Sequence, residues 1–239
     1  MRRARQGGVQ GARASMSLTY VIPDIHGRFD LLSEALHEVH VHAAGNGGTL
    51  IMLGDYVGKG PDSSKIIARL RRGMPPRWTF VPLKGNHDAM MVSARHDPAT
   101  ITHWLERGGD AVVESYGGNL LGIPEADIAW LETLPLIHTD AHRIYVHAGL
   151  DRGIACNAQS ETTLLWKRYP KADIAGFEGR HVVHGHNSFA EGPELYRGRT
   201  NLDTRAWRTG RLVTGVFDDA LPGGPVDFIV VHGPTQGIQ

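Results

Sequence analysis

From Leu18 onward, short apolar runs alternate with segments of helical spacing. Three runs are typical of buried strands that end in polar residues: TYVIPD (19–24), TLIMLGD (49–55) and TFVPLKGNHD (79–88). The two intervening segments, residues 29–42 and 61–72, repeat apolar residues at helical spacing. This β-α-β-α-β order predicts a parallel or mixed sheet with helices outside it.

The second half of the chain has a different order of predicted elements. Residues 98–130 predict helices and Gly-rich turns, and four strands should follow at 143–150, 181–186, 211–219 and 226–232. Because helices are missing between most of these strands, we expect them to be antiparallel. The whole pattern predicts an α/β fold, a four-layer αββα sandwich of two mixed sheets flanked by helices.

One domain is expected over residues 18–239, preceded by a tail. Residues 1–17 carry four arginines and no acidic residue, and they lack the apolar core of a secretory signal. We expect this segment to be disordered. Whether residues 1–16 are translated stays open, because Met16 could be the true first residue.

The candidate functional residues lie where the predicted strands end. Five motifs switch from apolar residues to Asp, His, Asn and Gly: IPDIHG (22–27), MLGDYVGKGPDS (52–63), LKGNHD (83–88), VHAGL (146–150) and VVHGH (182–186). In α/β sheets the carboxyl ends of strands meet at one edge, so these side chains should lie together. Imidazole and carboxylate together suit manganese, iron, zinc or cobalt better than calcium. The pattern predicts a two-metal site built from Asp24, His26, Asp55, Asn86, His147 and His186.

As a set, the motifs DxHG, GDxxxxG, GNH[ED], HAG and GH resemble the calcineurin-like metallophosphoesterases. Within that family the chain is similar to the phosphoprotein-phosphatase branch, which includes bacterial and phage protein phosphatases and symmetrical diadenosine tetraphosphatases. The resemblance covers residues 19 to 219. It implies two divalent ions, manganese first, with iron, zinc, cobalt or magnesium as alternatives.

The resemblance also implies a role for each residue. The first ion would be held by Asp24, His26 and Asp55. The second would be held by Asp55, Asn86, His147 and His186. A water or hydroxide between the ions would attack phosphorus.

Three further positions match residues that act on the substrate in the family. His87 falls on the position of the general acid. Lys59 and Arg168 fall on positions that contact phosphate.

The sequence departs from the family pattern beside the second motif. Protein phosphatases of this branch usually have GDxxDRG, whereas this chain has GDYVGKG. Gly58 therefore stands where a carboxylate partner of His87 is expected, and Lys59 replaces an arginine. An anhydride has a better leaving group than an ester and depends less on a general acid. Our hypothesis is that Gly58 and Lys59 shift the substrate preference toward phosphoanhydrides, as in the tetraphosphatase-like members. The sequence leaves this effect open.

Three functions consequently remain in view. The first is a protein phosphatase-like enzyme that acts on phosphate esters or phosphoanhydrides. The second is a symmetrical diadenosine tetraphosphatase-like or polyphosphate hydrolase. The third is a non-catalytic metal-binding module. The expected partner is a phosphorylated protein or a nucleotide or polyphosphate, and the native metals, physiological substrate and oligomeric state are open.

The composition indicates which kinds of binding partner and which cellular compartment to expect. The 25 Lys and Arg residues balance the 25 Asp and Glu residues, which gives no reason to expect duplex nucleic acid or a membrane. No apolar run is long enough to span a bilayer. Cys156 is the single cysteine, so no intrachain disulfide can form, which fits a cytoplasmic location.

Two other features have open roles. His184 lies two residues before His186 and is either a metal contact or a polar filler. Residues 104–118 are expected to cover the metal edge, where Trp104, Arg107 and Tyr116 either contact substrate or pack internally.

Overall fold

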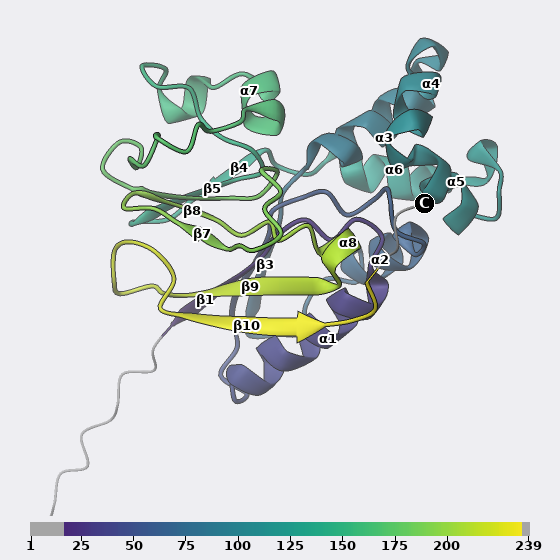
Figure 1. The fold of residues 1–239 in the computed structure, drawn as a ribbon. Coiled ribbons are helices and arrows are strands. Elements are labelled where there is room, and N and C mark those ends of the chain that lie inside the picture. Colours follow the sequence, from purple (N-terminus) through teal and green to yellow (C-terminus); the bar gives the residue numbers. More distant parts are fainter. Residues whose placement is uncertain (1–16, 236–239) are drawn as a thin grey trace, which may run out of the picture.

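The structure, a computed structural model, describes residues 17–235, so the predictions for residues 1–16 lie outside the described residues. Two five-stranded sheets dominate it (Figure 1). The first has the order β10-β9-β1-β2-β3. Its strands are β1 (Leu18–Ile22), β2 (Gly48–Met52), β3 (Trp78–Pro82), β9 (Arg211–Asp218) and β10 (Asp227–His232).

The first half of the chain forms the predicted β-α-β-α-β unit. Strand β1 runs parallel to β2, and β2 runs parallel to β3. The crossovers are α1 (Phe29–His42) and α2 (Ser63–Leu70), and α1 buries Leu32, Leu36 and Val39 as its spacing predicts. Strands β9 and β10 are antiparallel, as expected.

The second sheet has the order β4-β5-β6-β8-β7. Its strands are β4 (Ile137–Thr139), β5 (Arg143–Val146), β6 (His181–His184), β7 (Glu194–Leu195) and β8 (Arg199–Asn201). The expectation that this half is antiparallel is wrong for β5, β6 and β8, which pair in parallel. Parallel pairs need long crossovers. Residues 147–180, which include α7 (Glu161–Trp166), supply one between β5 and β6.

Alternating residues of the strands form the core between the sheets. One apolar cluster joins Val21 and Ile51 of the first sheet to Tyr145 and Val183 of the second. The opposite faces of β1 and β2 pack against α1 and α2. Because side chains along a strand point alternately to its two faces, each strand of the first sheet contributes to two apolar layers. The arrangement matches the predicted sandwich, although the outer cover of the second sheet is short helix and loop.

A group of helices lies beside the ends of the sheets (Figure 1). It contains α3 (Asn86–His96), α4 (Ile101–Trp104), α5 (Asp110–Ser115) and α6 (Glu125–Glu132). GNHD was expected at the end of the strand run 79–88, whereas α3 begins at Asn86, within that motif. Between α4 and α5, the turn Leu105–Gly109 leaves helical geometry at Arg107 and Gly108.

A four-residue helix, α8 (Ala206–Thr209), precedes β9. Within residues 17–235, no helix is both long and apolar enough to cross a bilayer.

Candidate metal centre

The five motifs meet at the carboxyl ends of parallel strands. Asp24 and His26 follow β1, Asp55 follows β2, and Asn86 and His87 open α3 after β3. His147 follows β5, and His186 follows β6. All of these side chains are buried. The two parallel strand sets thus bring together residues that are up to 162 positions apart in the sequence.

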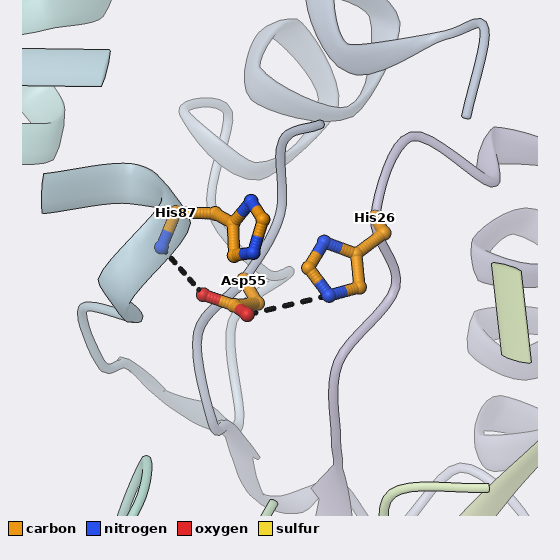
Figure 2. A group of neighbouring side chains, drawn as sticks. All are labelled: His26, Asp55 and His87. Carbon is orange, nitrogen blue, oxygen red and sulfur yellow. Dashed lines mark hydrogen bonds and ion pairs between the residues drawn. The ribbon is translucent and has the colours of Figure 1, made fainter. Parts of the chain in front are cut away.

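Asp55 lies at the centre of the arrangement (Figure 2). One carboxylate oxygen, Oδ2, is 3.3 Å from His26 Nε2. The other, Oδ1, accepts a hydrogen bond from the His87 backbone N–H at 2.9 Å and lies 3.5 Å from His147 Nε2. Two groups therefore share Asp55: His26 and His87 on one side, and His147 and His186 on the other. A carboxylate placed in this way can bridge two ions.

The second group converges on Asn86. Its amide oxygen is 2.8 Å from His147 Nε2 and 3.0 Å from His186 Nδ1. Asp24 is connected to this group because the His186 backbone N–H points between its two carboxylate oxygens, 3.2 Å from each. Asp24 also lines the cavity above the cluster.

The tautomers of two histidines show that this cluster suits cations. His26 Nδ1 is 3.0 Å from the Val57 carbonyl, and His147 Nδ1 is 2.9 Å from the Leu53 carbonyl. A carbonyl accepts only, so each Nδ1 carries the proton and each Nε2 presents a lone pair to the cluster. Those lone pairs face the carboxylate of Asp55, and His147 also faces the Asn86 oxygen. Such facing acceptors repel one another unless a proton or a metal cation lies between them.

The burial of these carboxylates and imidazoles also indicates a site for cations. It raises the pKa of Asp24 above its usual range, with the carboxylate of Asp203 adding to the effect. Burial also raises the pKa of Asp55 to about 7. It lowers the pKa of His26, and it lowers the pKa of His186 to about 2. His186 Nε2 is buried and has no hydrogen-bond partner among the described residues. Divalent ions would favour the ionised carboxylates and neutral imidazoles that this site requires.

The loops that carry these residues are held in unusual conformations. His26, Asp55 and His186 have positive φ values of 45°, 53° and 61°. Such backbone costs about 1–3 kcal/mol per residue and persists only where its surroundings enforce it. A Cβ at Gly85 would collide with Asp55, and a Cβ at Gly185 would collide with Asp24. These two glycines therefore allow the close approach of the loops.

Asp88 fixes the turn after β2. Its side chain is fully buried and accepts hydrogen bonds from the backbone N–H groups of Asp55 at 2.8 Å, Tyr56 at 3.0 Å and Gly85 at 2.8 Å. Asp88 therefore lies under the loops that carry the candidate ligands, where it orients Asp55.

His87 lies against Gly58, as the motif comparison implied. A Cβ on Gly58 would lie 3.1 Å from His87 Nδ1. No hydrogen bond or ion pair joins the His87 ring to a carboxylate within residues 17–235, although the ring lies near Asp55. Burial and the Lys59 ammonium lower the pKa of His87 to about 2. By geometry alone, His87 is also a candidate metal ligand.

A cavity of about 410 Å³ opens above the cluster. Lys59 and Arg168, the two predicted phosphate contacts, both line it. The Lys59 ammonium donates to His26 Nε2 at 3.0 Å, so in this structure the lone pair of His26 Nε2 faces the charge of Lys59. Arg168 is exposed at the rim.

The turn 105–109 forms part of the cavity wall through Glu106, Arg107 and Gly108, which confirms the expected cover over the metal edge. Trp104 and Tyr116 do not take part. Trp104 is buried in the core, and the Tyr116 hydroxyl donates to Asp127 at 2.7 Å. His184 also stays outside the cluster, because its ring is engaged by the Gly185 carbonyl and by Arg199.

Sequence reasoning missed two aromatic residues of the cavity. Trp166 and Trp207 both line it, at the end of α7 and within α8. Their positions in the sequence could have identified them as candidates. Trp166 lies two residues before Arg168, and Trp207 follows the segment TNLDTRA.

Comparison with known proteins gives one family. The sequence profile of the calcineurin-like phosphoesterase family matches residues 18–233. Serine/threonine-protein phosphatase 1 of Salmonella typhimurium is 35% identical over 91 residues, which are 38% of each chain. The symmetrical bis(5'-nucleosyl)-tetraphosphatase of Proteus mirabilis is 32% identical over 162 residues, 64% of this chain and 54% of the relative. The matched parts therefore span at most about half of these two relatives.

Solved structures agree with this result. A crystal structure assigned as a diadenosine tetraphosphatase superposes with a TM-score of 0.68 and 26% identity, over 92% of this chain and 95% of that chain. A metallophosphoesterase from Sphaerobacter thermophilus gives a TM-score of 0.56 at 19% identity, which shows the shared fold.

Proposed function

This chain belongs to the calcineurin-like phosphoesterase family, and we propose that it is a phosphohydrolase that works with two divalent metal ions. The observation that carries the proposal is the pair of His and Asp groups that share Asp55, with imidazole lone pairs facing carboxylate and amide oxygens. Asp24, His26 and Asp55 would hold one ion. Asp55, Asn86, His147 and His186 would hold the other. We propose manganese as the ion, since this donor set suits it.

Bound ions would supply Lewis-acid activation of water and neutralise phosphate charge. The chain's own groups bind and orient the substrate. Lys59 reaches the cluster with its ammonium, and Arg168 adds a guanidinium at the rim of the same cavity. Two cations at these positions would hold a phosphate chain against the metal edge.

We favour a phosphoanhydride, such as a dinucleoside polyphosphate, over a phosphoprotein as the substrate. The specific observation is that Gly58 lies beside His87, where an added Cβ would be 3.1 Å from Nδ1, and that no carboxylate among residues 17–235 hydrogen-bonds the His87 ring. An anhydride releases a phosphate group that needs less protonation than a serine or threonine alkoxide. The structural match to a diadenosine tetraphosphatase supports the same choice.

Phosphoprotein remains the second candidate, because a serine/threonine phosphatase is among the relatives. The test is the initial rate with manganese on diadenosine tetraphosphate, tripolyphosphate and a phosphothreonine peptide. We expect the anhydrides to be cleaved faster. A faster rate on the peptide would reverse the substrate assignment.

The control for all three substrates is Asp55→Asn, which replaces one oxygen of the Asp55 carboxylate with an NH₂ group and removes its charge. We expect it to abolish turnover and weaken manganese binding in calorimetry. If the purified protein binds manganese but turns over none of these substrates, nor p-nitrophenyl phosphate, with any of several metals, the result would favour a non-catalytic metal-binding module.

A further inference from the structure

The cavity above the metal cluster has an aromatic wall that the proposed hydrolysis does not need. Trp166 is 41% exposed, and Trp207 is partly buried. A water-exposed tryptophan beside a charged centre leaves a large apolar face uncovered, which a flat apolar ligand can bury. Metal ions and phosphate contacts would be complete without either side chain.

Trp207 is held rigidly relative to the metal-binding loop. Its helix α8 has only four residues and lies between two left-handed positions, Arg205 at φ 54° and Gly210 at φ 68°. The buried Arg28 guanidinium donates to the carbonyls of Ala206 and Trp207, 3.3 Å from each. Arg28 directly follows the IPDIHG motif, so one side chain connects the metal-binding loop to α8.

Arg28 is itself fixed, because Asp30 accepts from its Nε at 2.9 Å and from its Nη2 at 2.6 Å. A platform that is ordered before binding loses little conformational entropy when a ligand stacks on it.

Lys59 places this platform next to the phosphate. Its ammonium lies 3.0 Å from His26 Nε2 and 5.4 Å from the centroid of the Trp207 ring. A single cation therefore separates the indole from the metal-ligand cluster. A ligand that has a phosphate at the cluster and a flat ring a short distance away would contact Lys59 and Trp207 together.

Trp166 provides a second aromatic surface in the same cavity. Its ring packs edge to face with His186, at 6.2 Å between centroids. The residue ends α7, two positions before Arg168, so an aromatic and a cationic side chain lie close together at this rim.

We propose that Trp166 and Trp207 form a base-stacking subsite beside the metal centre and select substrates that carry a base over base-free polyphosphates. Aromatic side chains bind nucleobases of any type by stacking, and lysine beside them adds cation–π attraction. This inference rests on the proposed hydrolase function. It assigns Trp207 and Trp166 as specificity residues.

The first experiment compares kcat/KM for diadenosine tetraphosphate with kcat/KM for tripolyphosphate, which has no base. In Trp207→Ala, we expect the ratio of the two values to fall roughly 10- to 100-fold, the usual worth of one stacked base. Trp207→Phe should restore most of the ratio, because the ring is retained. Trp78→Phe, outside the cavity on β3, serves as the control and should leave the ratio at the wild-type value. Trp166→Ala is measured in parallel and should lower the ratio in the same direction.

Equal losses on both substrates would overturn the proposal, because they would show that Trp207 only positions Lys59. A loss confined to a phosphothreonine peptide would also overturn it and would assign the aromatic wall to peptide recognition.

A binding measurement separates this inference from the proposed hydrolysis. Calorimetry with AMP on wild-type protein and Trp207→Ala reports stacking even if no substrate is turned over. Weaker AMP binding to the variant, with unchanged manganese binding, supports the subsite. Equal AMP affinity, or no AMP binding to the wild-type protein, refutes it.

Discussion

Asp88 should determine both the stability of the metal-binding loops and their affinity for metal. Its carboxylate accepts from three buried backbone donors, those of Asp55, Tyr56 and Gly85. In Asp88→Ala all three donors lose their acceptor. A buried donor left unpaired costs about 1–3 kcal/mol. The three belong to one network, so their costs do not simply add, and we expect a loss of about 3–5 kcal/mol.

Asp88→Asn offers a milder test of the same contacts. Oδ2 of Asp88 receives the Asp55 and Gly85 donors, and Oδ1 receives that of Tyr56. An amide can keep one oxygen as acceptor for two donors but places its NH₂ group against the third. We expect this variant to lose about 1–3 kcal/mol, the cost of one buried donor.

Urea unfolding of the metal-free protein, followed by circular dichroism, gives the free energy of unfolding, and calorimetry gives the manganese affinity. The matched control is Asp140→Ala. Asp140 also accepts two backbone N–H groups and a tyrosine hydroxyl, but it lies in the turn between β4 and β5, at the opposite end of β5 from His147.

The control should lower stability without changing metal affinity, because no candidate ligand depends on Asp140. Both Asp88 variants should weaken manganese binding, because Asp55 loses its support. The reasoning fails if Asp88→Asn binds manganese as tightly as the wild-type protein, or if Asp88→Ala is no less stable than Asp140→Ala.

The double substitution Gly58→Asp with Lys59→Arg restores the usual phosphatase motif, and we expect the ester-to-anhydride rate ratio to rise. An unchanged ratio would remove Gly58 and Lys59 from the specificity argument, and the left-handed backbone at Gly58 (φ 91°) should make the variant less stable. Gly85→Ala should abolish manganese binding in calorimetry, because the new methyl group collides with Asp55; unaltered binding would show that the loops can move apart. His181 has a pKa lowered to about 4 by burial and a neighbouring arginine, whereas an unfolded histidine titrates near 6.5. Between these values only the unfolded chain binds the proton, so this contribution to stability is present above pH 6.5 and is lost as the pH falls toward 4. Urea unfolding at pH 4.5 and 6.5 should show a smaller pH dependence for His181→Gln than for the wild-type protein, and an equal dependence would contradict the assignment.

The candidate ligands were accessible to sequence reasoning because their signal is local. Each lies where an apolar run ends, and the carboxyl ends of parallel strands must meet at one edge of a sheet. The grouping of Asp55 with His147 also needed the family resemblance, because the strand before His147 was expected to be antiparallel. The helix over 29–42 was equally plain, because its apolar spacing is uninterrupted.

Other features depend on chain segments that only the folded state brings together. The parallel pairing of β5 with β6 follows from a crossover of irregular chain, which has no periodic pattern. Trp207 faces the metal edge because Arg28, far away in the sequence, holds its helix by two carbonyl groups. Asp88 supports Asp55 through backbone N–H groups, which every residue has and which carry no sequence signal. Strand ends and the family motifs thus indicated the candidate metal ligands, whereas long-range hydrogen bonds and packing decided which other residues surround the cavity.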